Sequence, residues 1–501
     1  MDARQKSLLE KKRVIARNKV TWQSAFFVCQ IALSYLLAMT TNNGSEICHA
    51  LRRNPIHFQK DILRIFNPKS ALHSTMKSMK YVYILALLLF YSYPQLLAKE
   101  TKPSLLVYGA GIEAFTAAVQ AARSNVPTLW VVNSDPSFHQ QADTRIAIVA
   151  NHHLDGGIWK ELLMKTGSSE AFSDSVAIAV KSDLNVRLLV NAMEDMIKKE
   201  NLLTIVKNND VESLVRGRNT WQVTLHNKKR YDIRAIVDAS LKGNLADKTK
   251  DKLTVPPVIP LKSIENLSVE QVRTTAAIAA FNQDCYVLTV RDIITQQANN
   301  IFFIRSFIPH TEDVEAIPLR AHIGQAVGAS AAYCAFFKTT AEKIDVRKLQ
   351  TELIGFRVRL LPWKNISQED PNFASIQKAY LATIFGDSEV NKRTEFEKQD
   401  SVYADSVRAV FNQYYSRSQL WFLDNNVTYF SLRDLLSFVK VLAFRGDEVD
   451  SQVQKDWNRK LHFGGEYDPN HVVNRYEFAT LIDRYASPFA KTVTLDGVIL
   501  R

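Results

Sequence analysis

Glycine is in short supply in this sequence. Only 16 of the 501 residues are glycine, less than half of the usual share of about 7%. With 46% hydrophobic and 23% charged residues, the chain has ordinary globular composition, which excludes collagen-like and disordered classes. Because glycine is the residue that tolerates unusual backbone angles and close approach, each of the few glycines present is informative.

Cysteine is also rare, and it follows no ligand pattern. The four cysteines are Cys29, Cys48, Cys285 and Cys334, which excludes a small disulfide-rich fold. His152 and His153 are adjacent but belong to no zinc-type motif. The sequence therefore predicts no metal site.

The excess of positive charge is confined to the beginning of the chain. Residues 1–98 hold 14 basic and 4 acidic residues, and the remaining chain holds 49 basic and 47 acidic residues. A nearly neutral main body lacks the basic surface that nucleic-acid binding requires. We therefore expect no nucleic-acid partner.

The apolar run that precedes the main body is shorter than the roughly 20 residues that a membrane-spanning helix needs. The run Tyr81–Tyr93 follows Lys77 and Lys80, and Leu96–Ala98 then provides a small residue. This layout predicts a secretory signal peptide over residues 76–98 and an exported protein, whether periplasmic, extracellular or envelope-associated. The alternative is an N-terminal anchor that associates with the membrane.

The first 75 residues do not fit a mature protein. Val20–Met39 is a second, more polar apolar stretch, with basic residues on both sides. If both stretches spanned a membrane, the loop between them would violate the positive-inside rule. Translation from Met76 or Met79 explains the pattern, so residues 1–75 are interpreted as an over-extended start or a leader.

The main body has an α/β pattern. Strand 104–108, helix 112–124 and strand 128–132 form a βαβ unit of the expected size. A long helix of small residues is expected at 323–339, and no strong internal repeat is found. Further strands are predicted at 203–206, 211–215 and 221–225 (interpreted as a meander), 234–238, 286–290 and 301–304. Further helices are predicted at 186–201, 268–280, 373–383, 401–415, 432–444 and 476–485.

The turn between the first strand and the first helix has the sequence Gly109-Ala110-Gly111-Ile112-Glu113-Ala114. It fits the G-x-G-x-x-A fingerprint in the strand–turn–helix context that dinucleotide binding requires. The helix N-terminus would then face a diphosphate with free amides and the positive end of its dipole. Asn133 stands where a ribose-binding acid is expected, and an amide accepts hydrogen bonds without charge assistance.

The main body resembles the FAD-dependent oxidoreductases of the glutathione-reductase-like superfamily, and within it a group of exported bacterial proteins. The resemblance lies in four segments that span about half of the chain: VYGAGIEA at 107–114, IVDASLKGNLA at 236–246, NIFFIR at 300–305 and RAHIGQAVGASAA at 320–332. It implies a Rossmann-like FAD-binding domain at 99–360, with a central parallel sheet and a β-meander, followed by a mostly helical C-terminal domain at 361–501.

The resemblance also implies which residues contact FAD. They are Gly109, Ala110, Gly111, Glu113, Ala114, Asn133, Val211, Ala239, Arg305, Gly324, Gln325 and Ala326. Arg320 and Arg305 would hold negative charge on a reduced flavin or on a carboxylate substrate, and a surface ion pair is the alternative. The chain departs from the family pattern at Asn133, at Ser240-Leu241 and at Asn244.

His322 is the candidate catalytic residue, because imidazole has the pKa best suited to proton transfer near a flavin. A role in positioning the loop is the alternative for this histidine. Gly324 and Gly328 lie one turn apart, so they also favour close packing of the helix.

The C-terminal part is similar to one divergent copy of an S-layer-homology helix pattern, at 373–386 and 473–483, with Asn474 in place of a threonine. Such domains attach proteins to cell-surface glycans, and a small helical domain packed on the main body is the alternative. The sequence thus predicts an exported FAD-dependent oxidoreductase that acts on a small molecule. The alternative is a non-catalytic cell-envelope protein that retains a degenerate flavoprotein scaffold.

Overall fold

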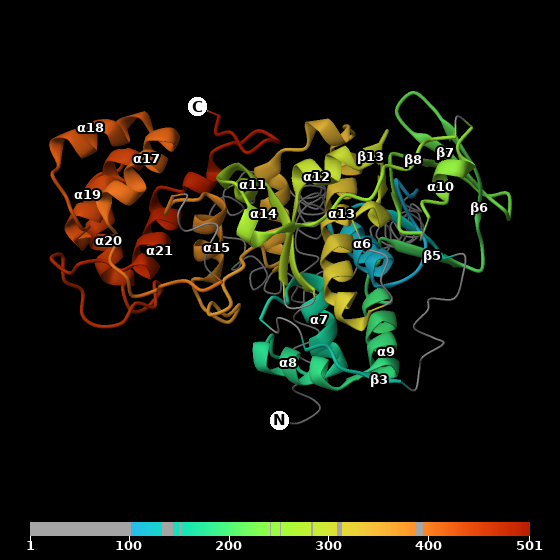
Figure 1. The fold of residues 1–501 in the computed structure, drawn as a ribbon, viewed down its shortest axis with the longest axis horizontal. Coiled ribbons are helices and arrows are strands. Elements are labelled where there is room, and N and C mark those ends of the chain that lie inside the picture. Colours follow the sequence, from blue (N-terminus) through green and yellow to red (C-terminus); the bar gives the residue numbers. More distant parts are fainter. Residues whose placement is uncertain are drawn as a thin grey trace, which may run out of the picture. The chain divides into compact units, whose positions relative to one another are not determined.

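The computed structural model describes residues 102–132, 144–149, 153–240, 242–250, 252–281, 284–307, 313–386 and 394–500. Asn133, Leu241 and the predicted signal segment lie outside these residues. Residues 100–501 form one compact unit. Figure 1 shows the elements of this unit, and the predicted boundary near residue 360 stays a prediction.

A six-stranded, mostly parallel sheet forms the centre of the α/β part. Its order is β13-β14-β9-β1-β2-β5, and only the β13–β14 pair is antiparallel. The central parallel sheet that the resemblance implies is confirmed, and strands 104–108 and 234–238 both belong to it, since Leu105 of β1 lies opposite Ala235 of β9. The strands are β1 (Leu105–Tyr108), β2 (Thr128–Val132), β5 (Leu203–Lys207), β9 (Ala235–Asp238), β13 (Gln297–Ala298) and β14 (Ile301–Phe303).

Alternation along these strands creates two separate cores. Leu105 and Val107 of β1 point into a core shared with the helices, whereas Leu106 and Tyr108 point into a second core against a small antiparallel sheet. This follows from the two-residue side-chain period of a strand. Both faces of the sheet are covered, which explains why its strands are continuously apolar.

The helical face is formed by α6 (Ile112–Arg123) and α13 (Ile317–Phe337), which lie side by side (Figure 1). Helix α13 is hydrophobic all round and buried along most of its length. It begins at Ile317, with Pro318 in its first turn, and not at residue 323 as predicted. Proline suits the first turn because its missing N–H is not needed there.

The opposite face carries the meander β6 (Val211–Arg216), β7 (Trp221–Leu225) and β8 (Arg230–Ile233). The prediction that strand 203–206 belongs to this meander is wrong. That strand is β5, which pairs in parallel with β2 and ends the central sheet. The third strand of the meander, β8, alternates between exposed Arg230 and Asp232 and buried Ile233, but its four residues are too few to give a strong strand signal.

A second antiparallel sheet contains β10 (Lys262–Ser263), β11 (Thr275–Phe281) and β12 (Asp284–Thr289). The helix predicted at 268–280 is wrong beyond its first turn. Ser268 and Gln271 form a capping box that starts the short helix α11 (Val269–Arg273). The alanine-rich segment that follows is extended in β11 and buried against β12 and α13, because tertiary packing outweighs helix propensity there.

Shorter elements connect these layers. The helices are α7 (Gly157–Thr166), α8 (Asp174–Ser182), α9 (Val186–Ile197), α10 (Leu245–Lys248), α12 (Val290–Thr295) and α14 (Val346–Gly355), and β3 (Arg145–Ile146) pairs with β4 (Leu184–Asn185). In the described part of the chain, no helix combines the length and the hydropathy needed to cross a membrane.

The C-terminal part is helical, as predicted. Its helices are α15 (Phe373–Leu381), α17 (Ala404–Tyr414), α18 (Ser416–Asp424), α19 (Leu432–Ala443), α20 (Glu448–Asp456) and α21 (Arg475–Tyr485) (Figure 1). Their apolar sides meet in a cluster of rings that includes Phe411, Phe430, Phe438 and Phe478.

Helices α17, α19 and α21 are entered in the same way. Each follows a short extended segment, and three antiparallel bridges close these segments into a ring: Ser401 with Asn474, Tyr403 with Tyr429, and Ser431 with Val472. In each bridge, the residue that precedes one helix pairs with the residue two positions earlier in the next segment. The structure therefore contains three copies of this helix entry, where the sequence indicated one.

Candidate functional site

The glycine turn lies at the carboxyl end of β1, in the middle of the central sheet. Gly109 and Gly111 have φ angles of 115° and 100°, which side chains other than glycine rarely adopt. The Gly109 amide donates to the Val131 carbonyl (3.1 Å), and the Trp130 indole donates to the Gly109 carbonyl (2.9 Å). The turn is thus held by β2 in the form that the fingerprint predicts.

Gly111 is also the N-cap of α6. It provides no side-chain cap, and the first amides of a helix have no acceptor within the helix. Those amides and the helix dipole make this end of α6 attractive to an anion. Ala114 is buried in α6, and its small side chain lets the helix approach the sheet.

Two arginines and one carboxylate stand next to this helix end. Arg320 of α13 donates to both carboxylate oxygens of Glu113, over 3.1 and 2.8 Å. A Cβ atom on Gly111 would lie 2.9 Å from Glu113 Oε2 and 3.2 Å from the guanidinium of Arg320. The space in front of Gly111 is therefore shared with this ion pair.

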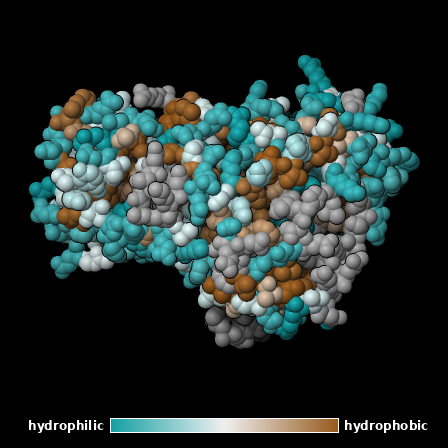
Figure 2. All heavy atoms as spheres, viewed as in Figure 1, coloured by the Kyte–Doolittle hydropathy of each residue, from teal (hydrophilic) through white to brown (hydrophobic). Residues whose placement is uncertain are grey.

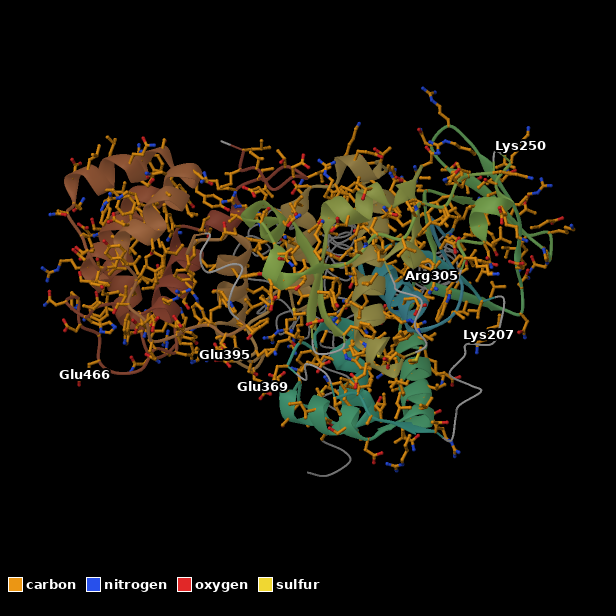
Figure 3. The ribbon with its side chains drawn as sticks, viewed as in Figure 1. Lys207, Lys250, Arg305, Glu369, Glu395 and Glu466 are labelled. Carbon is orange, nitrogen blue, oxygen red and sulfur yellow. The ribbon has the colours of Figure 1, made fainter. Side chains whose placement is uncertain are left out.

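Arg305 belongs to the same charge cluster. Partial burial and the neighbouring Arg320 lower its pKa, and Glu113 opposes this shift. Arg305 is labelled in Figure 3. Two cations and one anion thus leave a net positive charge beside the turn.

The loop after β9 completes the floor of the turn. A Cβ atom on Gly109 would lie 2.8 Å from the Ala239 carbonyl carbon, so glycine is required there for close approach. Asp238 fixes this loop by accepting hydrogen bonds from Ser240 N (2.9 Å), Ser240 Oγ (2.5 Å) and Leu245 N (2.9 Å). Burial nevertheless raises the pKa of Asp238 to about 6.

Gly324, Gln325 and Ala326 lie inside α13, and not at its N-terminus, because the helix starts at Ile317. Backbone amides within a helix are already bonded to the preceding turn. Gly324 and Gly328 instead allow α13 to pack on the backbone of α6 at Glu113 and Ala117. The Gln325 side chain accepts from Ile158 N (3.0 Å) and donates to Gln120 (2.7 Å), so it ties α7 to α6.

His322 lies two residues before Gly324 in α13, where it is buried near Asp155, Gly156 and Lys181. Burial lowers the pKa of His322 to about 4, and the negative charge of Asp155 opposes this shift. Asp155 itself pairs with the buried Lys181 over 2.5 Å. The imidazole is therefore neutral at physiological pH and is a weak base.

Val211 begins β6, and its amide donates to Asp210 Oδ1 (2.8 Å). The same oxygen accepts a hydrogen bond from the Tyr108 hydroxyl (2.6 Å), which places Val211 close to the end of β1. Sequence reasoning did not select Asp210, and an acid before a short strand gives no distinctive signal. Asn133 lies outside the described residues.

The structure thus brings part of the predicted set together. Gly109, Ala110, Gly111, Glu113 and Ala239 line the turn, with Arg305 and Arg320 beside them. His322, Gly324, Gln325 and Ala326 lie along α13, away from its N-terminal end.

Comparison with protein families identifies the α/β part. Residues 104–256 match the family model described as FAD dependent oxidoreductase. This segment is thus similar to the FAD-dependent oxidoreductases. The match covers the glycine turn, the meander and β9, which contain the first two segments on which the resemblance rested. The cofactor of this family is FAD.

Several solved structures have a partial likeness to this chain. One is bacillithiol disulfide reductase Bdr (YpdA) from Staphylococcus aureus, which is 16% identical over 28% of this chain and 38% of its own, with a TM-score of 0.20. The atypical thioredoxin reductase TRi from Desulfovibrio vulgaris Hildenborough is 18% identical over 27% and 35%, with a TM-score of 0.18. OTEMO in an FAD-bound form is 16% identical over 27% and 25%, with a TM-score of 0.19.

The matched region spans at most about two fifths of these solved chains. A comparison with curated proteins gives no match.

The described residues fit the diphosphate of FAD. Two positive-φ glycines give the backbone the required approach, and the end of α6 carries no side-chain cap. Arg305 and Arg320 provide charge of the correct sign, and the carboxylate of Glu113, which would oppose an anion, is already paired with Arg320. Backbone, dipole and charge therefore point to the same ligand group.

Proposed function

We propose that this chain is an exported flavoprotein that uses FAD to oxidise or reduce a small molecule. The observation that carries the proposal is the positive-φ turn at Gly109 and Gly111, which presents the uncapped end of α6 next to Arg305 and Arg320. Backbone geometry, helix dipole and side-chain charge converge there on one anionic group.

When bound, FAD supplies the redox chemistry, and the protein supplies position and charge. The amides at the start of α6 would hold the diphosphate. Arg320 and Arg305 would offset its charge, with the guanidinium fork suited to phosphate oxygens. Asp238 would not contact FAD itself. It would support the site indirectly, because it fixes the loop on which Ala239 approaches Gly109.

His322 remains the candidate for proton transfer with the substrate. Its buried imidazole is neutral near pH 7, so it would accept a proton rather than donate one. A pKa of about 4 makes it a weak base, which limits its contribution to the rate.

Export is proposed from the sequence alone, through the segment 76–98. Sequencing the N-terminus of the native protein tests this proposal. We expect a mature chain that begins after Ala98, and a peptide from residues 1–75 would contradict both the export signal and the later start.

A non-catalytic envelope protein is the second candidate, and one observation favours it. The Glu113–Arg320 pair lies in the space in front of Gly111, so the protein's own charges already satisfy one another there. The ring of three helix entries in the C-terminal part is the surface that we propose for a cell-surface glycan in this case.

Two substitutions in this ion pair distinguish the candidates. In the flavoprotein, Glu113→Gln removes the only carboxylate of the pair and should tighten FAD binding by roughly tenfold. Arg320→Gln should weaken binding about tenfold to a hundredfold, because a charge-assisted contact is lost. Exposed Arg459 is far from the turn in sequence and not part of its charge cluster, so Arg459→Gln is the matched control.

The measurement is a fluorescence titration of FAD into the purified protein and its three variants. Opposite effects of Glu113→Gln and Arg320→Gln, with no effect of Arg459→Gln, support the flavoprotein. If the wild type is colourless and takes up no FAD, the flavoprotein proposal fails and the non-catalytic envelope protein remains as the candidate.

A further inference from the structure

A second polar cavity opens at the opposite edge of the central sheet. It has a volume of about 140 Å³ and is lined by the β6–β7 loop, the β13–β14 turn and the end of α13. Arg234 precedes β9 and Asn300 precedes β14, so both residues lie at the amino ends of parallel strands. The glycine turn lies at the carboxyl end of β1, so the two sites are separated by the length of the strands.

Four cations line this cavity: Arg216, Arg218, Arg234 and Lys338. Within the described part of the chain, none of them pairs with a carboxylate. Glu342 is the only acid in the lining, and its carboxylate accepts a hydrogen bond from Gln297 (2.8 Å). With four cations and one carboxylate in its lining, the cavity therefore carries a net positive charge.

The walls of the cavity are fixed before any ligand arrives. Trp221 donates its indole hydrogen to the Asn299 carbonyl (2.9 Å), which links the meander to the β13–β14 turn. The Asn300 amide donates to the Thr339 carbonyl (2.9 Å) and accepts from Ala341 N (3.1 Å), which links the same turn to the end of α13. Asn299 and Asn300 both have positive φ, as such a tight turn requires.

The cations are also partly ordered. The Arg216 guanidinium lies 5.4 Å from the centre of the Trp221 ring, an arrangement that holds the charge over the aromatic face. Arg234 is half-buried, and a cation taken partly out of water without a counter-charge is unfavourable. An anion in the cavity would remove that cost.

We propose that this cavity binds a phosphate group. Its volume of about 140 Å³ leaves room for a tetrahedral anion. Three guanidinium groups match phosphate oxygens in pairs, and Asn219 and Thr220 add neutral donors. Near neutral pH a phosphate monoester carries a charge between about −1.5 and −2, which four cations and one carboxylate accommodate.

The test is a calorimetric titration of inorganic phosphate into the full chain at low salt. We expect saturable binding that weakens about tenfold or more in Arg234→Gln and in Arg218→Gln. Arg230→Gln is the matched control, because exposed Arg230 belongs to the same meander but does not line the cavity. Arg320→Gln separates this cavity from the glycine turn and should leave the phosphate affinity of the cavity unchanged.

Two outcomes would overturn the proposal: no saturable phosphate binding by the wild type, or equal affinity in Arg234→Gln, Arg218→Gln and Arg230→Gln. A second arm identifies the source of the phosphate group. Co-sedimentation with phosphatidic acid vesicles, lost in Arg218→Gln and absent with pure phosphatidylcholine, assigns the site to a lipid headgroup. Binding of inorganic phosphate without co-sedimentation assigns it to a soluble phosphate monoester.

Discussion

Two buried side chains, His322 of α13 and Asp238 of β9, should make the stability of the fold depend on pH in opposite directions. Burial lowers the pKa of His322 to about 4 and raises that of Asp238 to about 6. Unfolded histidine and aspartate have pKa values of about 6.5 and 3.9. As the pH falls from about 6.5 to 4, the unfolded chain gains a proton at the histidine that the folded chain does not, which destabilises the fold.

Asp238 has the opposite effect in nearly the same range. Its contribution is complete below about pH 3.9 and is lost as the pH rises through about 6, because the folded carboxyl holds its proton longer than the unfolded one. The two contributions to the pH dependence of the free energy of unfolding therefore largely cancel in the wild type between about pH 4 and 6.

Replacing His322 removes its contribution and leaves the pH dependence that Asp238 gives to the free energy of unfolding. In His322→Gln, the free energy of unfolding should rise as the pH falls from 6 to 4, by on the order of 1 kcal/mol per pH unit relative to the wild type. Urea unfolding at several pH values measures this, with exposed His462→Gln as control. Parallel curves for the wild type and His322→Gln would contradict the buried, neutral histidine.

At the scale of single residues, the sequence predicted those site features that depend on one residue type. Gly109 and Gly111 could be identified because glycine was scarce and the strand–turn–helix context was local. The pairing of Glu113 with Arg320 could not, since 207 positions separate them and either residue alone reads as a surface charge. The burial of His322 was also hidden, because it depends on where α13 begins.

Among the elements, the contact between α6 and α13 shows how small residues determine packing. Gly324 and Gly328 face the backbone of α6, and a Cβ on Gly328 would lie 2.6 Å from the Ala117 Cα. Backbone cannot move aside as a flexible side chain can, so the two helices must separate if that space is filled.

Gly328→Ala should therefore destabilise the fold by roughly 1–3 kcal/mol, although alanine is the better helix former. Gly355 at the end of α14 is the matched control, because no atom lies within 4 Å of its Cβ position. Gly355→Ala should leave stability unchanged or raise it by up to about 1 kcal/mol. Thermal unfolding of both variants provides the comparison, and a neutral Gly328→Ala would show that the helices are not in close contact.

Sequence patterns predicted elements well where periodicity and burial agree, and poorly elsewhere. The alanine-rich strand β11 was mistaken for a helix, since alanine favours helix and the segment lacks alternation. The three helix entries went unnoticed as a repeat, because they share only a similar backbone path and one buried apolar residue just before the N-cap, which is Val402, Phe430 or Val473. Asn474 and Ser431 form capping boxes, whereas Tyr403 provides no side-chain cap.

Across the whole molecule, buried arginines connect the sheets to the end of the chain. Arg273 is the last residue of α11 and donates to Thr383 Oγ1 (3.0 Å), Gln413 Oε1 (3.1 Å) and the Gly497 carbonyl (3.4 Å). Arg347 of α14 donates to the Leu381 carbonyl (3.3 Å), and burial lowers its pKa to about 10. Such long-range contacts explain why residues 100–501 form one compact unit, and no local pattern could predict them.

The surface adds a constraint on partners. Figure 2 shows a face on which hydrophilic side chains surround small apolar patches. Phe336 and Phe337 at the end of α13, and Leu423 of α18, are among the exposed apolar residues. They are scattered over distant elements, as on most soluble proteins. Function in this molecule is therefore best sought at the turn and cavity described above.

The central claim is that the turn at Gly109–Gly111 holds the diphosphate of FAD. The most direct measurement is an equilibrium titration of FAD into the wild type, Gly111→Val and Gly464→Val. Valine at residue 111 would adopt an unfavourable positive φ and place its side chain against Glu113 and Arg320, whereas residue 464 has open space around it. The account predicts that only Gly111→Val abolishes FAD binding, while all three proteins remain folded by circular dichroism. Normal FAD affinity in a folded Gly111→Val would contradict it.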